Sequence, residues 1–414
     1  MSQGKRKETR AEQTEHITRR IREVALEHIA KLGVDGLSMI GVAEDAGISK
    51  SPLYRRYDDA IDLTVDVWDH QLRTHLQTVL DHTLRFADTG DAEALTWLIS
   101  QIHRPSTESV ALIECIAVAR RYEYLQETIE IDVTRELESY VQSLPQLPVD
   151  ISLSYVVYVL GGLFIGSLLP CTEAETRDAL LLWDQYLRDP SLRVDREMPN
   201  TVRPIPLTYP EADDPTLGNL VVAATKVIMR TGFENATANR IARYANRAFS
   251  SSYAYFDSKE ELMLYATEFM FRDSIVRNDI MFLAGDEEEH IHAAASRIRE
   301  LTTQSASEDA RLFRIEATLA ARHHDELGRS IRNLFKQSLE QILMSTNKNQ
   351  KAQDEVRSVW IGVRTAGFGH NVFGLVATGF VDVDWMSTAR AAALVVSNHA
   401  MKNYRADVLK EMAS

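Results

Sequence analysis

The sequence predicts an all-α protein made of two similar halves. Apolar residues recur at helical spacing through most of the chain, and strand-like alternation is scarce. The segment 33–63 also recurs at 232–262, at a constant offset of 199 residues and without a gap. A period this long indicates a duplicated protein, because the repeats of solenoids are only about 20–50 residues long.

Seven of the 31 aligned positions are identical between the two segments. A second match, at an offset of 202 residues, relates 114–129 to 316–331, so the repetition extends beyond the short segments. The identical pairs of the first match are Gly33/Gly232, Ala43/Ala242, Ala46/Ala245, Ser51/Ser250, Tyr54/Tyr253, Asp58/Asp257 and Leu63/Leu262.

Local signals divide the first segment into helices. Apolar spacing predicts an amphipathic helix over 15–32, which Gly33 ends in the manner of a left-handed glycine. Ser38 is placed to cap a short helix, and Gly47 supplies the turn that follows it. Ser49 is expected to cap the next helix, whose first turn accepts a proline. The N-terminal half of that helix presents side chains as a recognition helix presents them to the major groove.

Both segments resemble the helix-turn-helix of the TetR/AcrR family of transcriptional regulators, whose pattern is roughly T-x-x-x-I-A-x-x-A-G-V-S-x-x-x-L-Y-x-Y-F-x-S-K-E-E-L. The first copy reads S-M-I-G-V-A-E-D-A-G-I-S-K-S-P-L-Y-R-R-Y-D-D-A-I-D-L, and the second closes with Y-F-D-S-K-E-E-L. The resemblance implies all-α units in which three N-terminal helices read DNA and a helical body dimerises and holds a small-molecule effector. Because one chain carries two such units, it implies an intramolecular pseudo-dimer.

The prolines mark the boundary between the units. Six of the 11 prolines fall between Pro190 and Pro215, and such a stretch favours extended linker conformations. The expected parts are a first helix-turn-helix domain (1–63), a first helical regulatory domain (64–189), a linker (190–214), a second helix-turn-helix domain (215–262) and a second helical regulatory domain (263–414).

Each copy departs from the family pattern. Ala60 replaces the lysine to which the resemblance assigns a phosphate contact. Asn246 and Ala248 replace the turn glycine and the cap serine of the second copy, although asparagine tolerates a left-handed backbone. The expected DNA-binding residues are Ser38, Ser49, Lys50, Ser51, Tyr54, Arg55, Arg56, Thr237, Arg240, Arg243, Arg247, Phe249, Ser250, Ser251, Tyr253 and Lys259.

Purely structural interpretations of these residues stay open. Tyr54 and Tyr253 could be packing residues, and Arg55 and Arg56 could be solvated surface charges. The second copy as a whole could be a degenerate helix-turn-helix kept for structure. The basic arm 5–10 could follow a minor groove or form a disordered tail.

The charge distribution is compatible with double-stranded DNA as a partner. The net charge is −14, yet residues 1–63 balance at zero and residues 214–262 at +1, which leaves −15 for the rest. Because a phosphate backbone responds to local fields, acidic bodies do not exclude DNA binding.

A cytoplasmic protein without a membrane span is expected. The two cysteines give no disulfide framework, and the N-terminus has no apolar signal core. The uncharged stretch 151–171 is long enough to cross a bilayer, but its flanks are acidic. We therefore expect a buried interface helix, which packs on the similarly glycine-punctuated 359–380.

Neither an enzyme nor a cofactor or metal site is indicated, because phosphate-loop and metal-ligand spacings are missing. Two functions are considered. The first is a ligand-responsive regulator, most simply a repressor, that reads an asymmetric operator with two unlike helix-turn-helix units. The second is a helical ligand- or protein-interaction module derived from such a regulator, with DNA binding weakened or lost. Expected effector contacts in the bodies are Trp97, Arg120, Arg121, Tyr122, Arg322, His323 and Trp360.

Overall fold

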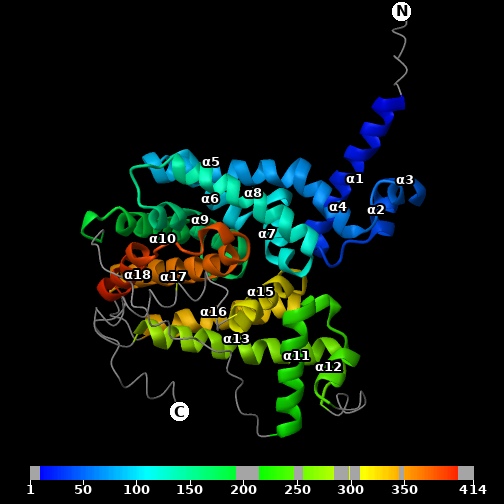
Figure 1. The fold of residues 1–414 in the computed structure, drawn as a ribbon. Coiled ribbons are helices and arrows are strands. Elements are labelled where there is room, and N and C mark those ends of the chain that lie inside the picture. The colour runs from blue at the N-terminus through cyan, green and yellow to red at the C-terminus, as the bar shows by residue number, and fades with distance from the viewer. Residues whose placement is uncertain are drawn as a thin grey trace, which may run out of the picture.

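The computed structural model describes residues 10–192, 214–246, 255–283, 298, 308–344 and 349–399. Every regular element in those ranges is helical, which confirms the all-α fold class (Figure 1). Most of the expected linker, 193–213, lies outside the described residues.

The α-helices of the first half are α1 (Arg10–Leu32), α2 (Met39–Asp45), α3 (Lys50–Tyr54), α4 (Ala60–Val67), α5 (Arg73–Thr89), α6 (Ala92–His103), α7 (Thr107–Val118), α8 (Glu123–Gln142), α9 (Val149–Ile165) and α10 (Glu173–Leu187). Those described in the second half are α11 (Pro215–Asn235), α12 (Ala238–Tyr244), α13 (Lys259–Leu283), α15 (Glu308–His323), α16 (Asp325–Met344), α17 (Gln350–Val376) and α18 (Met386–His399). Helix α1 begins at Arg10 rather than at Glu15, so the first helix is longer than the apolar spacing predicts.

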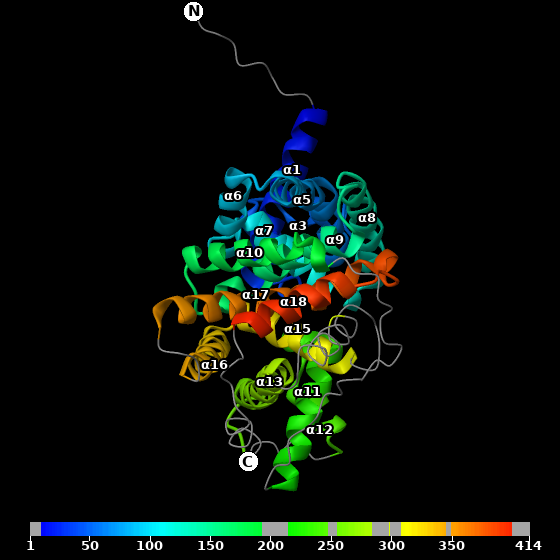
Figure 2. The same cartoon turned by 90° about the vertical axis from the view of Figure 1, so that its left-hand side faces the viewer.

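The helices of the two halves lie one above the other (Figures 1 and 2). Helices α17 and α18 pack directly against α9 and α10. Helices α1–α4 and helices α11 and α12 lie at the same end of the molecule, at the right of Figure 1. The helical bodies extend from there toward the other end.

Helix α9 crosses α17 at two glycines. Gly161 lies against the backbone of Thr365 and of Gly369, and Gly369 lies against the carbonyl group of Val157. A Cβ atom at either glycine would overlap backbone atoms of the other helix. Glycine is therefore required here for close approach of the two backbones, and the glycine-punctuated stretches predict this contact.

The apolar stretch of the first half is a core helix. Val149–Leu168 is the one described helix that is long and apolar enough to cross a membrane, and 94% of its most apolar window is buried inside the structure. The side chains of Tyr155, Tyr158 and Phe164 on this helix are each at most 1% exposed. This agrees with the expected buried interface helix.

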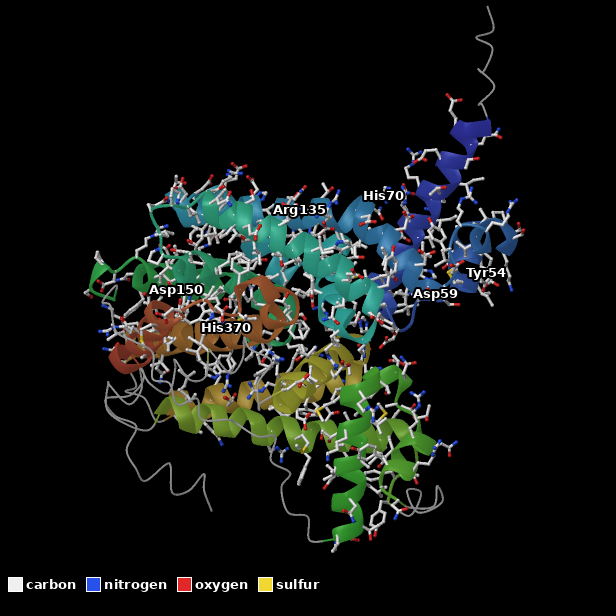
Figure 3. All side chains as sticks on the ribbon, viewed as in Figure 1. Tyr54, Asp59, His70, Arg135, Asp150 and His370 are labelled. Carbon is white, nitrogen blue, oxygen red and sulfur yellow. The ribbon has the colours of Figure 1, made fainter. Side chains whose placement is uncertain are left out.

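A hydrogen-bonded contact between the halves fixes the start of α18. Asp150, in the first turn of α9, accepts a hydrogen bond from the backbone nitrogen of Thr388 (3.0 Å). Ser154 Oγ lies 2.6 Å from Thr388 Oγ1. Asp150 is 4% exposed, and this burial raises the pKa of its carboxyl group to about 6 (Figure 3).

Candidate DNA interface and the joint between the halves

The first helix-turn-helix forms much as the sequence predicts. Ser38 caps α2 by accepting a hydrogen bond from the backbone nitrogen of Gly41 (3.3 Å), and Gly47 makes the turn with φ of 68°. Tyr54, labelled in Figure 3, is 50% exposed, which is not the burial of a core residue. The exposed side chains on this unit that we expected to contact DNA are Ser38, Ser49, Lys50, Ser51, Tyr54 and Arg55.

The structure departs from our expectations at the start and at the end of α3. Ser49 occupies the N-cap position but makes no capping hydrogen bond, and Pro52 at the third helical position has no N–H to donate. The helix ends at Tyr54, so Arg55 and Arg56 follow it instead of lying on its early turns. The half-buried Arg56 donates from Nη1 to the Pro52 carbonyl oxygen (2.8 Å) and from Nε to Thr18 Oγ1 (3.2 Å). Its guanidinium is thus held by the protein itself.

The described part of the second helix-turn-helix keeps the cap of its first helix and a left-handed residue at the turn. Thr237 caps α12 by accepting a hydrogen bond from the backbone nitrogen of Arg240 (3.3 Å). Asn246, at the position of the turn glycine, has φ of 52° and is the one described non-glycine residue with positive φ. Arg240 and Arg243 are exposed on α12.

The remaining expected contacts of this unit fall outside the described structure. Lys259 begins α13, but its side chain lies outside the described part of the chain. Also outside the described residues are Arg247, Phe249, Ser250, Ser251 and Tyr253.

The helix that follows each reading segment starts in the same way. Asp59 accepts a hydrogen bond from the backbone nitrogen of Asp62 (2.9 Å), and Asp62 accepts one from the residue before the cap (3.0 Å). Ser258 accepts from the backbone nitrogen of Glu261 (3.0 Å), and Glu261 accepts from the residue before that cap (2.7 Å). These residues correspond at the offset of 199, so the two segments share a local geometry as well as a sequence pattern.

A buried ion-pair cluster joins the first reading unit to the second body. Arg121 Nη1 lies 2.9 Å from Glu316 Oε2, and Arg121 Nη2 lies 2.8 Å from Asp35 Oδ2. Arg120 also reaches Glu316 (2.8 Å). The side chains of Glu316 and Asp35 are only 1% and 8% exposed. Tyr122 donates its hydroxyl hydrogen to Asp35. Because Asp35 follows α1 and Glu316 lies on α15, the contact connects the two halves.

The second half supplies the counterpart of this arrangement. His323 Nε2 lies 3.2 Å from Glu114 Oε2, and His324 Nε2 lies 2.6 Å from Glu234 Oε1. Glu316 of the second half thus binds Arg121 of the first half, and Glu114 of the first half binds His323 of the second half. We call these contacts together the joint cluster; its corresponding pairs are Asp35/Glu234, Glu114/Glu316, Arg121/His323 and Tyr122/His324.

Helix α1 ends at a left-handed glycine beside the joint cluster, and α11 is kinked at the equivalent glycine. Gly33 and Gly232 have φ of 75° and 78°. A Cβ atom at Gly33 would lie 2.7 Å from Glu114 Oε1, and one at Gly232 would overlap the guanidinium of Arg121. The α1 and α11 helices are therefore seated against the charged groups that link the halves.

His323 is a titratable member of the joint cluster. Its burial acts to lower its pKa, but the hydrogen bond and the charge of Glu114 outweigh that burial, so the pKa of His323 is raised. The equivalent Arg121 keeps its charge throughout the physiological range. The two reciprocal contacts therefore respond differently to pH.

The expected effector contacts do not surround a common pocket. Arg120, Arg121, Tyr122, Arg322 and His323 gather in or beside the joint cluster, where the cavity measures about 20 Å³ and has room for about one water molecule. These residues bind the carboxylates of Asp35, Glu114 and Glu316 and neighbouring carbonyl groups. Trp97 stacks on His82 (4.0 Å between ring centroids), and Trp360 donates to Ser338 (3.2 Å) in the other body.

Metal-binding groups are not assembled in the described part of the structure. None of its His, Cys, Asp and Glu side chains form a group of three or more that could hold a metal ion. Cys115 is buried, Cys171 is half-buried, and both are free thiols.

Helices α2 and α3 with the turn between them form a helix-turn-helix unit, and a helical body follows it. Residues 220–266 match the family of bacterial regulatory proteins, tetR family, and this match covers the second of the two reading units. The HTH-type nicotine-responsive transcriptional repressor HdnoR of Paenarthrobacter nicotinovorans is 28% identical over 145 residues, which are 34% of this chain and 73% of that protein. Both findings support a TetR-type DNA-binding regulator.

Proposed function

We propose that this chain is a transcriptional repressor in which two tandem TetR-like units form one intramolecular pseudo-dimer. The joint cluster is the observation that carries this proposal. Reciprocal contacts between equivalent residues are what a two-fold interface between like subunits produces. Here Glu316 pairs with Arg121 and Glu114 pairs with His323 within one chain. Placement of both reading units at one end of the molecule supports a common DNA partner (Figure 1).

The operator of such a protein is asymmetric. Operator symmetry mirrors protein symmetry, and the two readers differ at Lys50/Phe249 and Arg55/Ala254. Arginine and lysine are the usual partners of guanine, whereas phenylalanine and alanine make apolar contacts. Lys50 and Arg55 are exposed and free to reach a base, so the first unit carries most of the sequence discrimination.

The repressor responds to a small-molecule effector. The name of the related protein describes a nicotine-responsive repressor, which supports effector control in this chain but does not transfer its ligand. The joint cluster supplies a route for control, since it contacts both reading units and both bodies. A change in the packing of the helical bodies would alter the positions of α1 and α11 relative to those bodies. We place this regulator in the cytoplasm, where operator DNA is available.

Binding of DNA from the region upstream of its own gene tests the proposal. The purified full chain is titrated into that DNA at modest salt, with an unrelated fragment of equal length as competitor. We expect a specific complex that Lys50→Ala and Arg55→Ala each weaken by about 1–3 kcal/mol. Lys336→Ala, an exposed change on α16 away from both readers, is the matched control. Equal affinity for both DNA fragments would contradict sequence-specific repression and favour a module that has lost DNA reading.

A further inference from the structure

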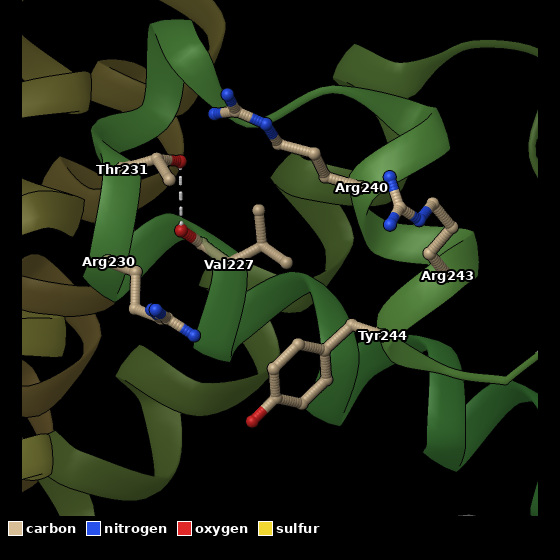
Figure 4. A pocket seen from close by; sticks show the side chains of 6 residues that line it. All are labelled: Val227, Arg230, Thr231, Arg240, Arg243 and Tyr244. Carbon is tan, nitrogen blue, oxygen red and sulfur yellow. Dashed lines mark hydrogen bonds between the residues drawn. The ribbon is translucent and has the colours of Figure 1, made fainter.

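A groove between α11 and α12 gathers positive charge on this acidic protein. Its volume is about 470 Å³, and Arg230 and Thr231 face the residues of α12 across it (Figure 4). Lys226 extends the charge, with its Nζ atom 5.9 Å from the ring centroid of Tyr244. The described residues that line the groove include no acidic side chain: they are Val227, Arg230, Thr231, Arg240, Arg243 and Tyr244.

The guanidinium groups of this groove are available to a ligand. Arg230, Arg240 and Arg243 are all exposed. Arg240 donates one hydrogen bond, from Nη1 to the carbonyl oxygen of Asn235 (3.0 Å). Within the described residues, the guanidinium groups of Arg230 and Arg243 make no hydrogen bond or ion pair. Like charges this close repel one another, so the cluster is better explained by an anionic partner than by folding.

The equivalent place in the first unit has the opposite character. At the offset of 199, Lys226, Arg243 and Tyr244 correspond to Glu27, Glu44 and Asp45. His28 Nε2 lies 2.7 Å from Asp45 Oδ2 and spans the gap between α1 and α2. The second unit has Val227 there, which leaves the groove open. At the seven positions formed by Lys226 and the six lining residues, the second unit thus carries four cations, whereas the first unit carries three acids and one lysine.

We propose that the α11–α12 groove binds a phosphate group of the DNA backbone. This inference rests on the proposed function, because it requires that the chain binds DNA. Helix α12 is the first helix of its motif, and the first helix of a helix-turn-helix crosses the backbone while the second enters the major groove. Arginine suits this role because its planar fork of donors matches phosphate oxygens. The two units then have different roles: the first contacts bases, and the second binds the phosphate backbone.

Salt dependence of DNA binding distinguishes a phosphate contact from a base contact. The full chain and the variant Arg230→Gln/Arg243→Gln are titrated with specific and with unrelated DNA over a range of salt concentrations. We expect the slope of log K against log salt to become shallower by about 0.9 for each phosphate that the variant no longer neutralises, thus by about 1–2. Specific and unrelated DNA should weaken by the same factor, since backbone contacts carry no sequence information. Lys31→Gln, at the position equivalent to Arg230, should leave the slope unchanged.

Each other result overturns the inference. An unchanged slope in a variant that still binds DNA would reject the groove while leaving the proposed function intact. Loss of preference at a single base position would make the groove a base reader. Inorganic phosphate that raises the melting temperature of the wild type but not of the variant, without any change of slope, would assign the groove to a free anion. A wild-type chain that fails to bind DNA would reject the groove and the proposed function together.

Discussion

Neutralising Glu316 should strongly destabilise the protein if the joint cluster holds the halves together. Its carboxylate is 1% exposed and lies within 3 Å of both Arg120 and Arg121, at 2.8 and 2.9 Å. Glu316→Gln keeps the size of the side chain but leaves two buried guanidinium groups with Asp35 as the remaining close carboxylate. Removing one partner of a buried ion pair typically costs about 3–5 kcal/mol, because an uncompensated charge stays in a poorly hydrated site. We expect a loss of about 3 kcal/mol here.

Urea unfolding followed by circular dichroism measures this change. For a slope of about 3 kcal/mol per molar urea, the midpoint should fall by about 1 M. Glu326→Gln, an exposed change on α16, should stay within about 0.5 kcal/mol of wild type. Adding Arg120→Met to Glu316→Gln should cost less than the sum of the single changes, because the second change removes one of the stranded charges. A Glu316→Gln variant as stable as the Glu326→Gln control would refute this account of the joint.

Three further changes have expected outcomes. Gly161→Ala should destabilise by about 1–3 kcal/mol in thermal unfolding because its methyl group meets the backbone of α17, whereas Gly367→Ala has no atom within 4 Å and should be neutral or stabilise by up to about 1 kcal/mol. The raised pKa of His323 gives the protein stability that is complete below the ordinary pKa of histidine and is lost as pH rises through the raised pKa. His323→Gln should therefore flatten the fall in stability as pH rises above about 6.5. The pKa of Asp150 is raised to about 6, so the protein likewise loses stability as pH rises through 6. The free energy of unfolding of Asp150→Asn, measured in urea titrations, should therefore rise by about 2–3 kcal/mol relative to that of wild type as pH is raised from 4 to 7.

Local signals in the sequence predicted local structure well. The cap at Ser38 follows from residue type and position, and the left-handed turn at Asn246 follows from what asparagine tolerates. The cap at Ser49 does not form, and the proline that suits the first turn removes one of the two backbone donors that such a cap uses. The guanidinium of Arg56 is held partly by Thr18 of α1, which lies 38 residues away in the sequence. No local sequence pattern reveals such a contact.

The joint cluster could not be derived from spacing. Arg121 and His323 looked like effector contacts because they are polar residues on long apolar bodies, and their partners lie on the other half of the chain. The repeated glutamate at 114 and 316 was the available signal, since a buried acid repeated in both halves needs a basic partner. The packing of α7 against α15 brings each glutamate to the opposite half.

Selection of bound sequences from random DNA, followed by footprinting of the selected site, tests the central claim most directly. The claim is that one chain presents two unlike readers to one operator. We predict two dissimilar half-sites about one helical turn apart or slightly more, both protected, with the stronger base preference under the first unit. A perfect inverted repeat would contradict the claim, and so would protection of a single half-site.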